Sequence, residues 1–434
     1  MSFQDTIAYL YSLQQYGMKF GLDNIRRLMS ALDNPQDTFR SVHVAGTNGK
    51  GSTASMIESM LRTAGVTTGL FTSPHLVSFT ERIRVNGREI SEADVVALAD
   101  EVRTAAAGIP DFSPTFFEVT TAMAFLCFRK MRVEWAVVEV GMGGRLDATN
   151  ILMPEASVIT GIDIDHREFL GETLHKIAGE KAGIIKQGRP VISSSQHAEV
   201  MDVLMRKAGE YGSAFYFFGE DFTAEITAED LTCIKIDYQG IAAYQGLAVQ
   251  LAGRHQAMNA AVAVRTIEEI TRAYPALRCD IRRGLRDVRW PGRLEFVKER
   301  PPVLIDGAHN PQAAAVLAAY LKKALELYSR IILVIGVMAD KDREGIMRPL
   351  LPLASEIIFT APAYGRAASP EILAAQARGL GYFSMTASTV SEALSLAEEL
   401  STQGDLIVVT GSFYTIGEAL EALGHAGVLA RLRE

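Results

Sequence analysis

The residues with the clearest chemical signature form the loop Gly46-Thr47-Asn48-Gly49-Lys50-Gly51-Ser52, which directly follows a short β-branched run. Its glycines allow successive backbone N–H groups to face an anion, Lys50 adds a positive charge, and the Ser52 hydroxyl can reach Mg²⁺. The spacing differs from the generic Walker A loop, because Val44 stands where the first glycine belongs and Gly51 separates the lysine from the hydroxyl. We predict a nucleoside triphosphate site, with a ligand-free glycine-rich turn as the alternative.

An acidic residue stands at the end of a second predicted strand. Glu139 lies in the apolar run at residues 137–140 and opens the glycine-rich turn at residues 141–147. Ligands of open α/β sheets bind beyond the carboxyl ends of the strands. Because Mg²⁺ prefers oxygen donors, Glu139 is a candidate metal ligand. The alternative is a surface acid that caps the turn.

A third strand end carries Asp165-His166, which follows the apolar run at residues 158–162. His166 is a candidate metal ligand, and Asp165 could orient its ring. A single histidine is more often a polar residue with satisfied hydrogen bonds. The parallel placement of Glu139 favours the metal site.

Basic residues supply further candidates. Arg82 and Arg84 lie two positions apart on a predicted strand, so they are expected to share one face and could bind a substrate carboxylate bidentately. A solvated strand face is the alternative. Lys181, near the end of the predicted helix at residues 174–182, reads from composition as an ordinary exposed lysine.

The segment Asp306-Gly307-Ala308-His309-Asn310 follows another predicted strand and leads into a helix that begins at Pro311. Asn310 fits a helix N-cap, and proline is favoured at the first helical position. The same segment could also line one wall of a nucleotide cleft between two domains. Both interpretations can hold together.

The elements that must position these residues follow an α/β pattern. Apolar strands are predicted at residues 42–45, 67–71, 135–140, 156–159 and 190–192, with helical stretches between them. Continuously apolar strands indicate a mostly parallel sheet covered on both faces by helices. Residues 215–251 read as short alternating strands, which predicts a β-rich appendage before a helix at residues 256–273.

A domain boundary is predicted at residues 290–293, where Pro and Gly interrupt the pattern. The first domain, residues 1–292, would be a P-loop-type sheet domain with its β-rich appendage. The second, residues 293–434, would be a smaller Rossmann-like α/β domain. Its strands are predicted at residues 303–305, 331–335, 356–359 and 406–409.

Composition limits the class of protein. The 434 residues are 48% hydrophobic and 22% charged, with a formal net charge of -8, which describes an ordinary globular chain and disfavours nucleic-acid binding. Its three cysteines are widely spaced, so neither a disulfide framework nor a zinc site is indicated. No apolar run approaches the roughly 18 residues of a membrane span, and we expect a cytoplasmic protein without membrane contact.

Taken in order, these segments resemble the folylpolyglutamate synthase and dihydrofolate synthase family, a branch of the ATP-dependent Mur ligase superfamily. The similar segments extend over nearly the whole chain, at residues 21–22, 45–52, 73–84, 114–118, 139–150, 165–166, 180–186, 253–259, 290–295, 306–310 and 411–414. Two of them, residues 73–84 and 114–118, resemble the folate branch rather than the branch that builds cell walls. Any one of these segments is weak evidence, but all of them in the same order along the chain identify it as similar to this family.

The resemblance implies an enzyme that uses ATP to phosphorylate a folate or pteroate carboxylate, after which the amino group of L-glutamate attacks the acyl phosphate. It further implies that ATP is bound by Gly49, Lys50, Gly51, Ser52, Asn259, Arg293 and Asp306. Among these, Arg293 would face the phosphates and Asp306 the ribose or its surroundings. The nucleotide would then lie between the two domains.

Two Mg²⁺ ions are implied, one of them held by Ser73, Glu139 and His166. By the same similarity Lys181 would be carbamylated, which turns a cation into an anion able to bind or position magnesium. Lys50, Lys181 and His166 would then form the catalytic group. The chain departs from the family at residues 167–169, where Arg-Glu-Phe replaces a smaller polar stretch.

The pterin pocket implied by the resemblance draws on Thr115, Phe117 and Asp147, with Asp147 accepting from pterin nitrogens. Either Phe117 or its neighbour Phe116 would stack on the pterin ring. Arg82 completes the set of expected substrate-binding residues.

We therefore expect an ATP-dependent ligase that joins L-glutamate to dihydropteroate, to the γ-carboxylate of reduced folates, or to both. Residues 146–150 look like the bacterial bifunctional type, which favours both activities. Two alternatives remain: a Mur-type ligase acting on a different acid, and a regulatory switch that hydrolyses nucleotide. The expected partners are small molecules, and the expected state is a monomer.

Overall fold

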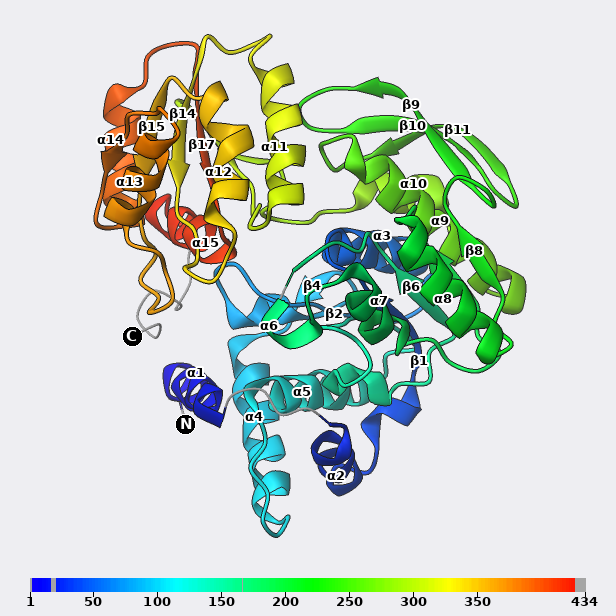
Figure 1. Cartoon of the computed structure of the whole chain (residues 1–434). Coiled ribbons are helices and arrows are strands. Elements are labelled where there is room, and N and C mark those ends of the chain that lie inside the picture. Colours follow the sequence, from blue (N-terminus) through cyan, green and yellow to red (C-terminus); the bar gives the residue numbers. More distant parts are fainter. Residues whose placement is uncertain (1, 17–20, 166, 426–434) are drawn as a thin grey trace.

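The computed structural model describes residues 2–16, 21–165 and 167–425, and its largest sheet has eight strands in the order β4-β3-β2-β5-β1-β6-β7-β8 (Figure 1). The run from β2 to β8 is parallel throughout, as predicted, while β3 and β4 extend it as antiparallel strands. The strands are β1 (Arg40–Ala45), β2 (Thr68–Phe71), β3 (Ile83–Val85), β4 (Arg88–Glu89), β5 (Trp135–Glu139), β6 (Ala156–Ile159), β7 (Val191–Ser193) and β8 (Phe215–Phe217).

Helices cover both faces of this sheet, because its central strands are apolar on both sides. One core joins Val42 and Val44 of β1 to α3 (Lys50–Arg62), α9 (His255–Ala273) and α10 (Ile281–Asp287). The opposite face is covered by α4 (Glu92–Ala107), α5 (Phe116–Lys130), α7 (Leu174–Ala182) and α8 (Ala198–Glu210). Within the described ranges, none of the helices is both long enough and apolar enough to cross a lipid bilayer.

The predicted β-rich appendage is a three-stranded antiparallel sheet of β9 (Thr223–Glu229), β10 (Ile234–Gln239) and β11 (Ala243–Val249). The alternation of β10 buries Ile234, Ile236 and Tyr238 in the core that includes α9. One expectation is wrong, because β8 pairs in parallel with β7 and extends the large sheet instead of joining the appendage. A short strand carries no local signal of which sheet it will join.

A second α/β unit follows, with six strands in the order β12-β13-β17-β14-β15-β16. They are β12 (Glu295–Glu299), β13 (Pro302–Ile305), β14 (Arg330–Ile335), β15 (Glu356–Phe359), β16 (Met385–Thr386) and β17 (Asp405–Thr410). The predicted strands are present and parallel, while the edge strands β12 and β16 were not expected. α11 (Pro311–Ala324), α12 (Arg343–Leu350) and α13 (Pro370–Gly379) cover one face, and α14 (Val390–Leu400) and α15 (Phe413–Ala422) the other.

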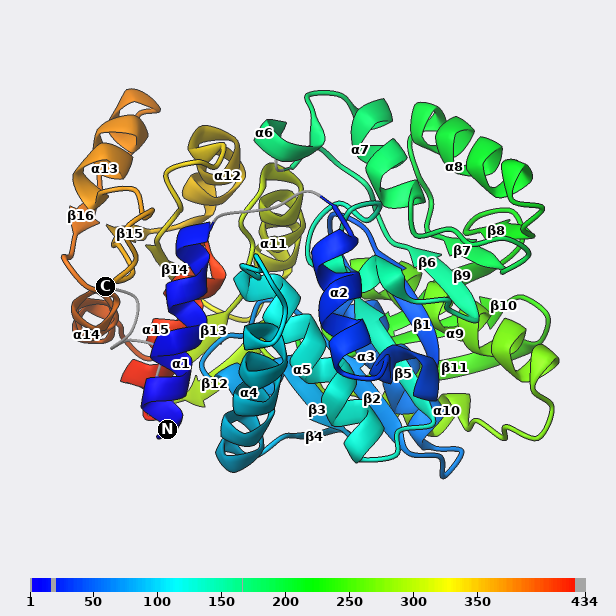
Figure 2. The same cartoon turned by 90° about the horizontal axis from the view of Figure 1, so that it is seen from below.

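The carboxyl ends of the parallel strands position the site. β1 ends at Ala45 and enters the phosphate loop, its neighbour β5 ends at Glu139, and β13 of the second sheet ends directly before Asp306. Figures 1 and 2 show the six-stranded sheet with its helices beside the eight-stranded unit, and the start of α11 reaches the phosphate loop. The two sheets therefore bring their strand ends to one shared region.

Candidate active site

Glycines shape the phosphate loop where neighbouring groups leave no room for a side chain. Gly46 has a φ of 153°, and a Cβ there would lie 1.8 Å from Thr160 Oγ1. Gly49 has a φ of 88°, and a Cβ there would lie 2.6 Å from Asn259 Oδ1. Both positions require glycine on conformational and steric grounds. The predicted nucleotide residue Asn259 thus lies directly against the loop.

The loop leads straight into α3, whose first residue is Lys50. A Cβ on Gly51 would lie 2.5 Å from the Trp290 ring, so the segment before β12 covers this turn of the helix. Ser52 is buried in the same turn. Because α3 begins where the loop ends, its positive dipole end and its free backbone N–H groups face the space that the loop encloses. This arrangement binds phosphates.

Three predicted residues meet at the ends of β1 and β5. Lys50 Nζ lies 3.9 Å from Glu139 Oε1, and the Ser73 N–H donates to Glu139 Oε2 at 3.2 Å. Burial raises the pKa of the Glu139 carboxyl, and Lys50 is the strongest of the groups that oppose this shift. Glu139 is only 4% exposed, so it is not a surface acid capping a turn.

Lys181 is not the exposed lysine that its sequence context suggests. Its side chain is buried at the end of α7, and its Nζ donates to the Gly46 carbonyl of the phosphate loop at 2.7 Å. Burial, with a further contribution from the nearby charge of Lys50, lowers the pKa of Lys181 to about 7. The structure thus places a buried lysine, whose charged form is disfavoured by burial, directly on the phosphate loop.

Arg293 and Asp306, from the unit with the six-stranded sheet, lie on the side of the site opposite the phosphate loop. The Arg293 guanidinium lies 4.4 Å from the Phe413 ring centroid, and burial lowers its pKa while Asp306 and Glu139 oppose the shift. Asp306 accepts hydrogen bonds from the N–H groups of Leu294 and Ala308, both at 3.0 Å. Asp306 is held rigidly between two backbone donors.

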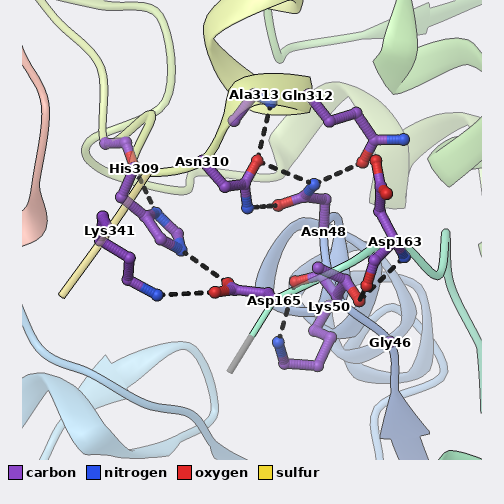
Figure 3. Close-up of polar contacts among 12 residues, drawn as sticks. Gly46, Asn48, Lys50, Asp163, Asp165, His309, Asn310, Gln312, Ala313 and Lys341 are labelled. Carbon is purple, nitrogen blue, oxygen red and sulfur yellow. Dashed lines mark hydrogen bonds and ion pairs between the residues drawn. The ribbon is translucent and has the colours of Figure 1, made fainter. Parts of the chain in front are cut away.

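Side-chain amides connect the phosphate loop to the start of α11, in the unit with the six-stranded sheet (Figure 3). Asn310 Nδ2 donates to Asn48 Oδ1 at 3.0 Å, and Asn48 Nδ2 donates to Gln312 Oε1 at 2.5 Å. Asn310 Oδ1 accepts from the Ala313 N–H at 2.9 Å, so Asn310 also caps α11, as predicted. The helix cap and the contact with the phosphate loop are made by the same side chain.

A second contact across the sheets involves Asp165. Its Oδ1 is 2.7 Å from Lys341 Nζ, and its Oδ2 is 3.8 Å from His309 Nε2 (Figure 3). Asp165 was expected to orient the ring of His166, which lies outside the described residues. The described contacts of Asp165 join it to Lys341 and His309 of the six-stranded unit.

The turn after β5 brings Phe117 and Asp147 together. A Cβ on Gly141 would lie 2.4 Å from the Phe117 ring, and the next residue, Met142, donates its N–H to Asp147 Oδ2 at 2.9 Å. Asp147 is buried, and burial raises the pKa of its carboxyl. The same turn thus contacts the Phe117 ring through Gly141 and the buried Asp147 carboxylate through Met142.

The neighbouring candidates have separate environments. Thr115 caps α5 and accepts from the Glu118 N–H at 3.2 Å. The Phe116 ring stacks on Tyr11 at 5.6 Å between centroids. The Phe117 ring has an aromatic neighbour too, Phe71 at 6.0 Å between centroids, but it lies against Gly141 at the start of the turn that carries Asp147.

The expectation that Arg82 and Arg84 share one strand face is wrong. Arg82 ends the 3₁₀ turn η3 (Phe79–Arg82), is buried, and donates from Nε to His75 Nδ1 at 2.5 Å. Its guanidinium lies 5.2 Å from the Phe116 ring centroid, whereas that of Arg84 lies 5.4 Å from the Trp290 ring centroid. The turn breaks the strand alternation on which the expectation relied.

One cleft runs between the two units and collects several of these groups. It is lined by Gly51, Thr72, Ser73, Pro74, Leu76, Glu81, Arg84, Glu139, Trp290, Pro291, Arg293 and Phe413. Hydroxyl and carboxylate oxygens from Ser73 and Glu139 are the hard donors that suit Mg²⁺. Among the described residues no group of three His, Cys, Asp or Glu side chains could hold a metal on its own. Ser73 and Glu139 could therefore supply two of the oxygen ligands of a magnesium ion.

Three groups at the site were not predicted from the sequence: Trp290 against the phosphate loop, Phe413 under Arg293, and Lys341 beside Asp165. For Lys341 a signal was present, since it follows β14 in the segment Ala339-Asp340-Lys341-Asp342, at the carboxyl end of a parallel strand. No local pattern distinguishes Trp290 or Phe413 from core aromatic residues.

Comparison with known proteins gives the same picture over the whole chain. Residues 44–267 match the Mur ligase middle domain, and residues 292–413 match the Mur ligase glutamate ligase domain. The chain is 34% identical to the dihydrofolate synthase/folylpolyglutamate synthase of Bacillus subtilis, over 97% of this chain and 99% of that one. The enzyme of the same description from Mycobacterium tuberculosis is 36% identical, over 93% of this chain and 90% of that one.

Solved structures agree. The Mycobacterium tuberculosis folylpolyglutamate synthase, solved with ADP and AMPPCP, superposes with a TM-score of 0.89 at 35% identity, over 98% of this chain and 100% of that one. Escherichia coli FolC, solved with DHPP and ADP, gives a TM-score of 0.85 at 31% identity, over 96% of this chain and 97% of that one. Fold, site and relatives together show that the chain belongs to the folylpolyglutamate synthase/dihydrofolate synthase family of Mur ligases.

Proposed function

We propose that the protein is an ATP-dependent ligase that forms an amide between L-glutamate and the carboxylate of dihydropteroate, and also extends reduced folates at their γ-carboxylate. Full-length relatives named for both activities, from Bacillus subtilis and Mycobacterium tuberculosis, support this assignment. The main structural support is that Lys50 and Ser73 both contact Glu139 beside the phosphate loop. Arg293 of the second unit lines the same cleft.

The reaction consists of two displacements. The substrate carboxylate attacks the γ-phosphorus of ATP and releases ADP, and the glutamate amine then attacks the acyl phosphate carbonyl and releases inorganic phosphate. Lys50 and Arg293 are proposed to balance the charge of the transferring phosphoryl group. Asn259 and Asp306 hold the nucleoside, while Gly49, Gly51 and Ser52 present backbone and hydroxyl donors to the phosphates.

Magnesium is the implied metal, and when bound it neutralises phosphate charge. Ser73, Glu139 and His166 are the proposed ligands of one ion, and a second ion would lie near Ser52. Lys181 is proposed to carry a carbamate, because its buried position and lowered pKa supply the neutral amine that reacts with CO₂. The carbamate would replace a positive charge beside the phosphate loop with a negative one.

The proposed pterin pocket consists of Thr115, Phe117 and Asp147. Phe117 is favoured over Phe116 for stacking, because its ring packs against Gly141 of the turn that carries Asp147, while the Phe116 ring stacks on Tyr11. Arg82 is proposed to bind farther along the substrate through the guanidinium nitrogens that do not contact His75.

We further propose that the domain boundary lies between residues 292 and 293, because the strands of the eight-stranded sheet all precede this point and those of the six-stranded sheet all follow it. We propose a monomer that works in the cytoplasm, where a reducing environment keeps its three free cysteines as thiols.

Mass-spectrometric product analysis tests the function. Dihydropteroate and tetrahydrofolate are offered separately with ATP, Mg²⁺ and L-glutamate. The mass of each product should exceed that of its substrate by one glutamyl unit. The variant Lys50→Ala is the control, since it should fold normally and lose at least about a hundredfold in turnover. ATP hydrolysis that needs neither substrate would support a switch, and ligation only of another acid would support a different Mur-type ligase.

A further inference from the structure

A buried chain of three side chains lies behind the turn that carries Asp147. His43 Nε2 is 2.8 Å from Thr149 Oγ1, and Thr149 Oγ1 is 2.5 Å from Asp147 Oδ1. His43 and Thr149 have no exposed surface, while Asp147 keeps 7%. The chain therefore runs from the interior of the large sheet to a carboxylate at the edge of the proposed pocket.

The fold, and not the local sequence, assembles this chain. Val42 and Val44 face the core of α3 and α9, so the alternation of β1 points His43 to the opposite face. On that face the 3₁₀ turn η4 (Ala148–Ile151), which follows Asp147, presents Thr149 to the histidine ring. The two partners are 106 residues apart in the sequence.

The direction of the hydrogen bonds can be assigned. Asp147 accepts from the Thr149 N–H at 3.0 Å on Oδ1 and from the Met142 N–H at 2.9 Å on Oδ2, as an ionised carboxylate does. The Thr149 hydroxyl has one proton, which goes to this carboxylate, so its oxygen must accept from His43. His43 is therefore the Nε2–H tautomer. Its Nδ1 is buried without a hydrogen-bond partner, as a deprotonated ring nitrogen can be.

The same count limits what Asp147 can do for a ligand. A carboxylate offers about four acceptor positions. The Thr149 and Met142 N–H groups and the Thr149 hydroxyl use three of them, and the Gly141 N–H also lies close to the carboxylate. A ligand can therefore reach only the small part of the Asp147 carboxylate that stays exposed, so the orientation of this carboxylate decides whether it can accept a further hydrogen bond.

We propose that Thr149 and His43 are positioning residues that orient the Asp147 carboxylate so that it accepts a hydrogen bond from a ring N–H of the substrate. The inference rests on the proposed function, in which that ring is a pterin. Thr149 acts on Asp147 directly, and His43 acts through Thr149 by holding its hydroxyl proton toward the carboxylate.

Substitutions of Thr149 test the first step. Thr149→Val removes the hydroxyl at nearly constant shape, and we expect the KM for dihydropteroate to rise about tenfold, equivalent to about 1.4 kcal/mol. The value of kcat and the KM for ATP should change less than about twofold, because the phosphate loop is untouched. Thr149→Ser, which keeps the hydroxyl, should restore the KM to within about twofold of the unsubstituted protein.

The test of His43 must separate an effect on protein stability from an effect on the orientation of the Asp147 carboxylate. His43→Leu alone leaves the Thr149 hydroxyl without its buried donor, whereas the double variant His43→Leu/Thr149→Val replaces both polar partners with apolar groups and should recover stability. In the double variant the KM for dihydropteroate should stay raised. His43→Gln, whose amide nitrogen can take the place of Nε2, should bind dihydropteroate nearly as the unsubstituted protein does.

The outcomes separate this inference from the proposed function. If Asp147→Asn raises the KM for dihydropteroate but Thr149→Val and the double variant leave it unchanged, the pocket stands and the positioning roles are wrong. If Asp147→Asn also has no effect, the proposed pocket itself is wrong. Nitrogen NMR of histidine-labelled protein gives a readout independent of activity, because a proton found on His43 Nδ1 would overturn the assigned direction of the chain.

Discussion

Lys181 is buried against the phosphate loop, with its Nζ 2.7 Å from the Gly46 carbonyl. Because carbamylation requires a neutral amine, the pKa of about 7 makes the reaction accessible near neutral pH. We expect Lys181→Ala to lose at least about a hundredfold in turnover and to be partly rescued by formate or acetate, which can occupy the vacated space. Lys181→Arg should be equally inactive and not rescued, since its side chain fills that space. Full activity of Lys181→Ala would contradict the proposal.

Glu139 supports a second prediction at the scale of single residues. The change Glu139→Gln keeps the shape and removes one negative charge beside Lys50 and the Ser73 N–H. We expect the Mg²⁺ concentration at half-maximal activity to rise by about tenfold or more, while the KM for dihydropteroate changes little. Activity measured against Mg²⁺ concentration checks this, and an unchanged midpoint would remove Glu139 from the proposed metal ligands.

At the scale of elements, α9 anchors the three-stranded sheet through Glu268. This buried carboxylate accepts from the Tyr238 hydroxyl at 2.8 Å and from the N–H groups of Ile241 and Ala242 at 3.1 and 2.9 Å, at the turn between β10 and β11. Glu268→Ala leaves these donors without their acceptor, and it removes one of the two buried carboxylates that pair with Arg265, the other being Glu269. We expect the free energy of unfolding to fall by about 3 kcal/mol, measured by urea denaturation, with kcat unchanged.

A matched control for this prediction is Glu344, whose ion pair with Arg348 is solvent-exposed. Glu344→Ala should change the free energy of unfolding by less than about 1 kcal/mol, because exposed pairs are weakly stabilising. If the two substitutions lowered the free energy of unfolding equally, Glu268 would not hold the three-stranded sheet to α9.

At the scale of the whole molecule, contacts across the two sheets bring the second unit onto the phosphate loop. Asn310 caps α11 and pairs with Asn48, so Asn310→Ser keeps a good cap but is too short to reach the loop. We expect kcat to fall about tenfold and more than one ADP to form per amide, because a loosely seated unit lets water reach the acyl phosphate. The melting temperature should stay within about 2 °C, since serine and asparagine cap helices equally well. A ratio of one ADP per amide in this variant would show that the contact does not seat the second unit.

Much of the fold follows from local sequence patterns. Apolar runs bounded by turns predicted β1, β5 and β6 of the large sheet and β13, β14, β15 and β17 of the small one, and the helix predicted at residues 174–182 is α7. The pattern failed where partners decide the outcome. β8 has no local feature that assigns it to the large sheet, and the half-buried β12 becomes a strand because it pairs with β13.

By itself the sequence determined the phosphate loop, the strand-end position of Glu139 and the helix cap at Asn310, because backbone conformation and capping depend on residues a few positions apart. Only the tertiary structure decided that Lys181 is buried on a loop 135 residues away, and that Asp165 faces Lys341 across 176 residues. These pairings depend on how distant elements pack, and packing decides burial, hydrogen-bond partners and pKa values, none of which has a signal in local periodicity.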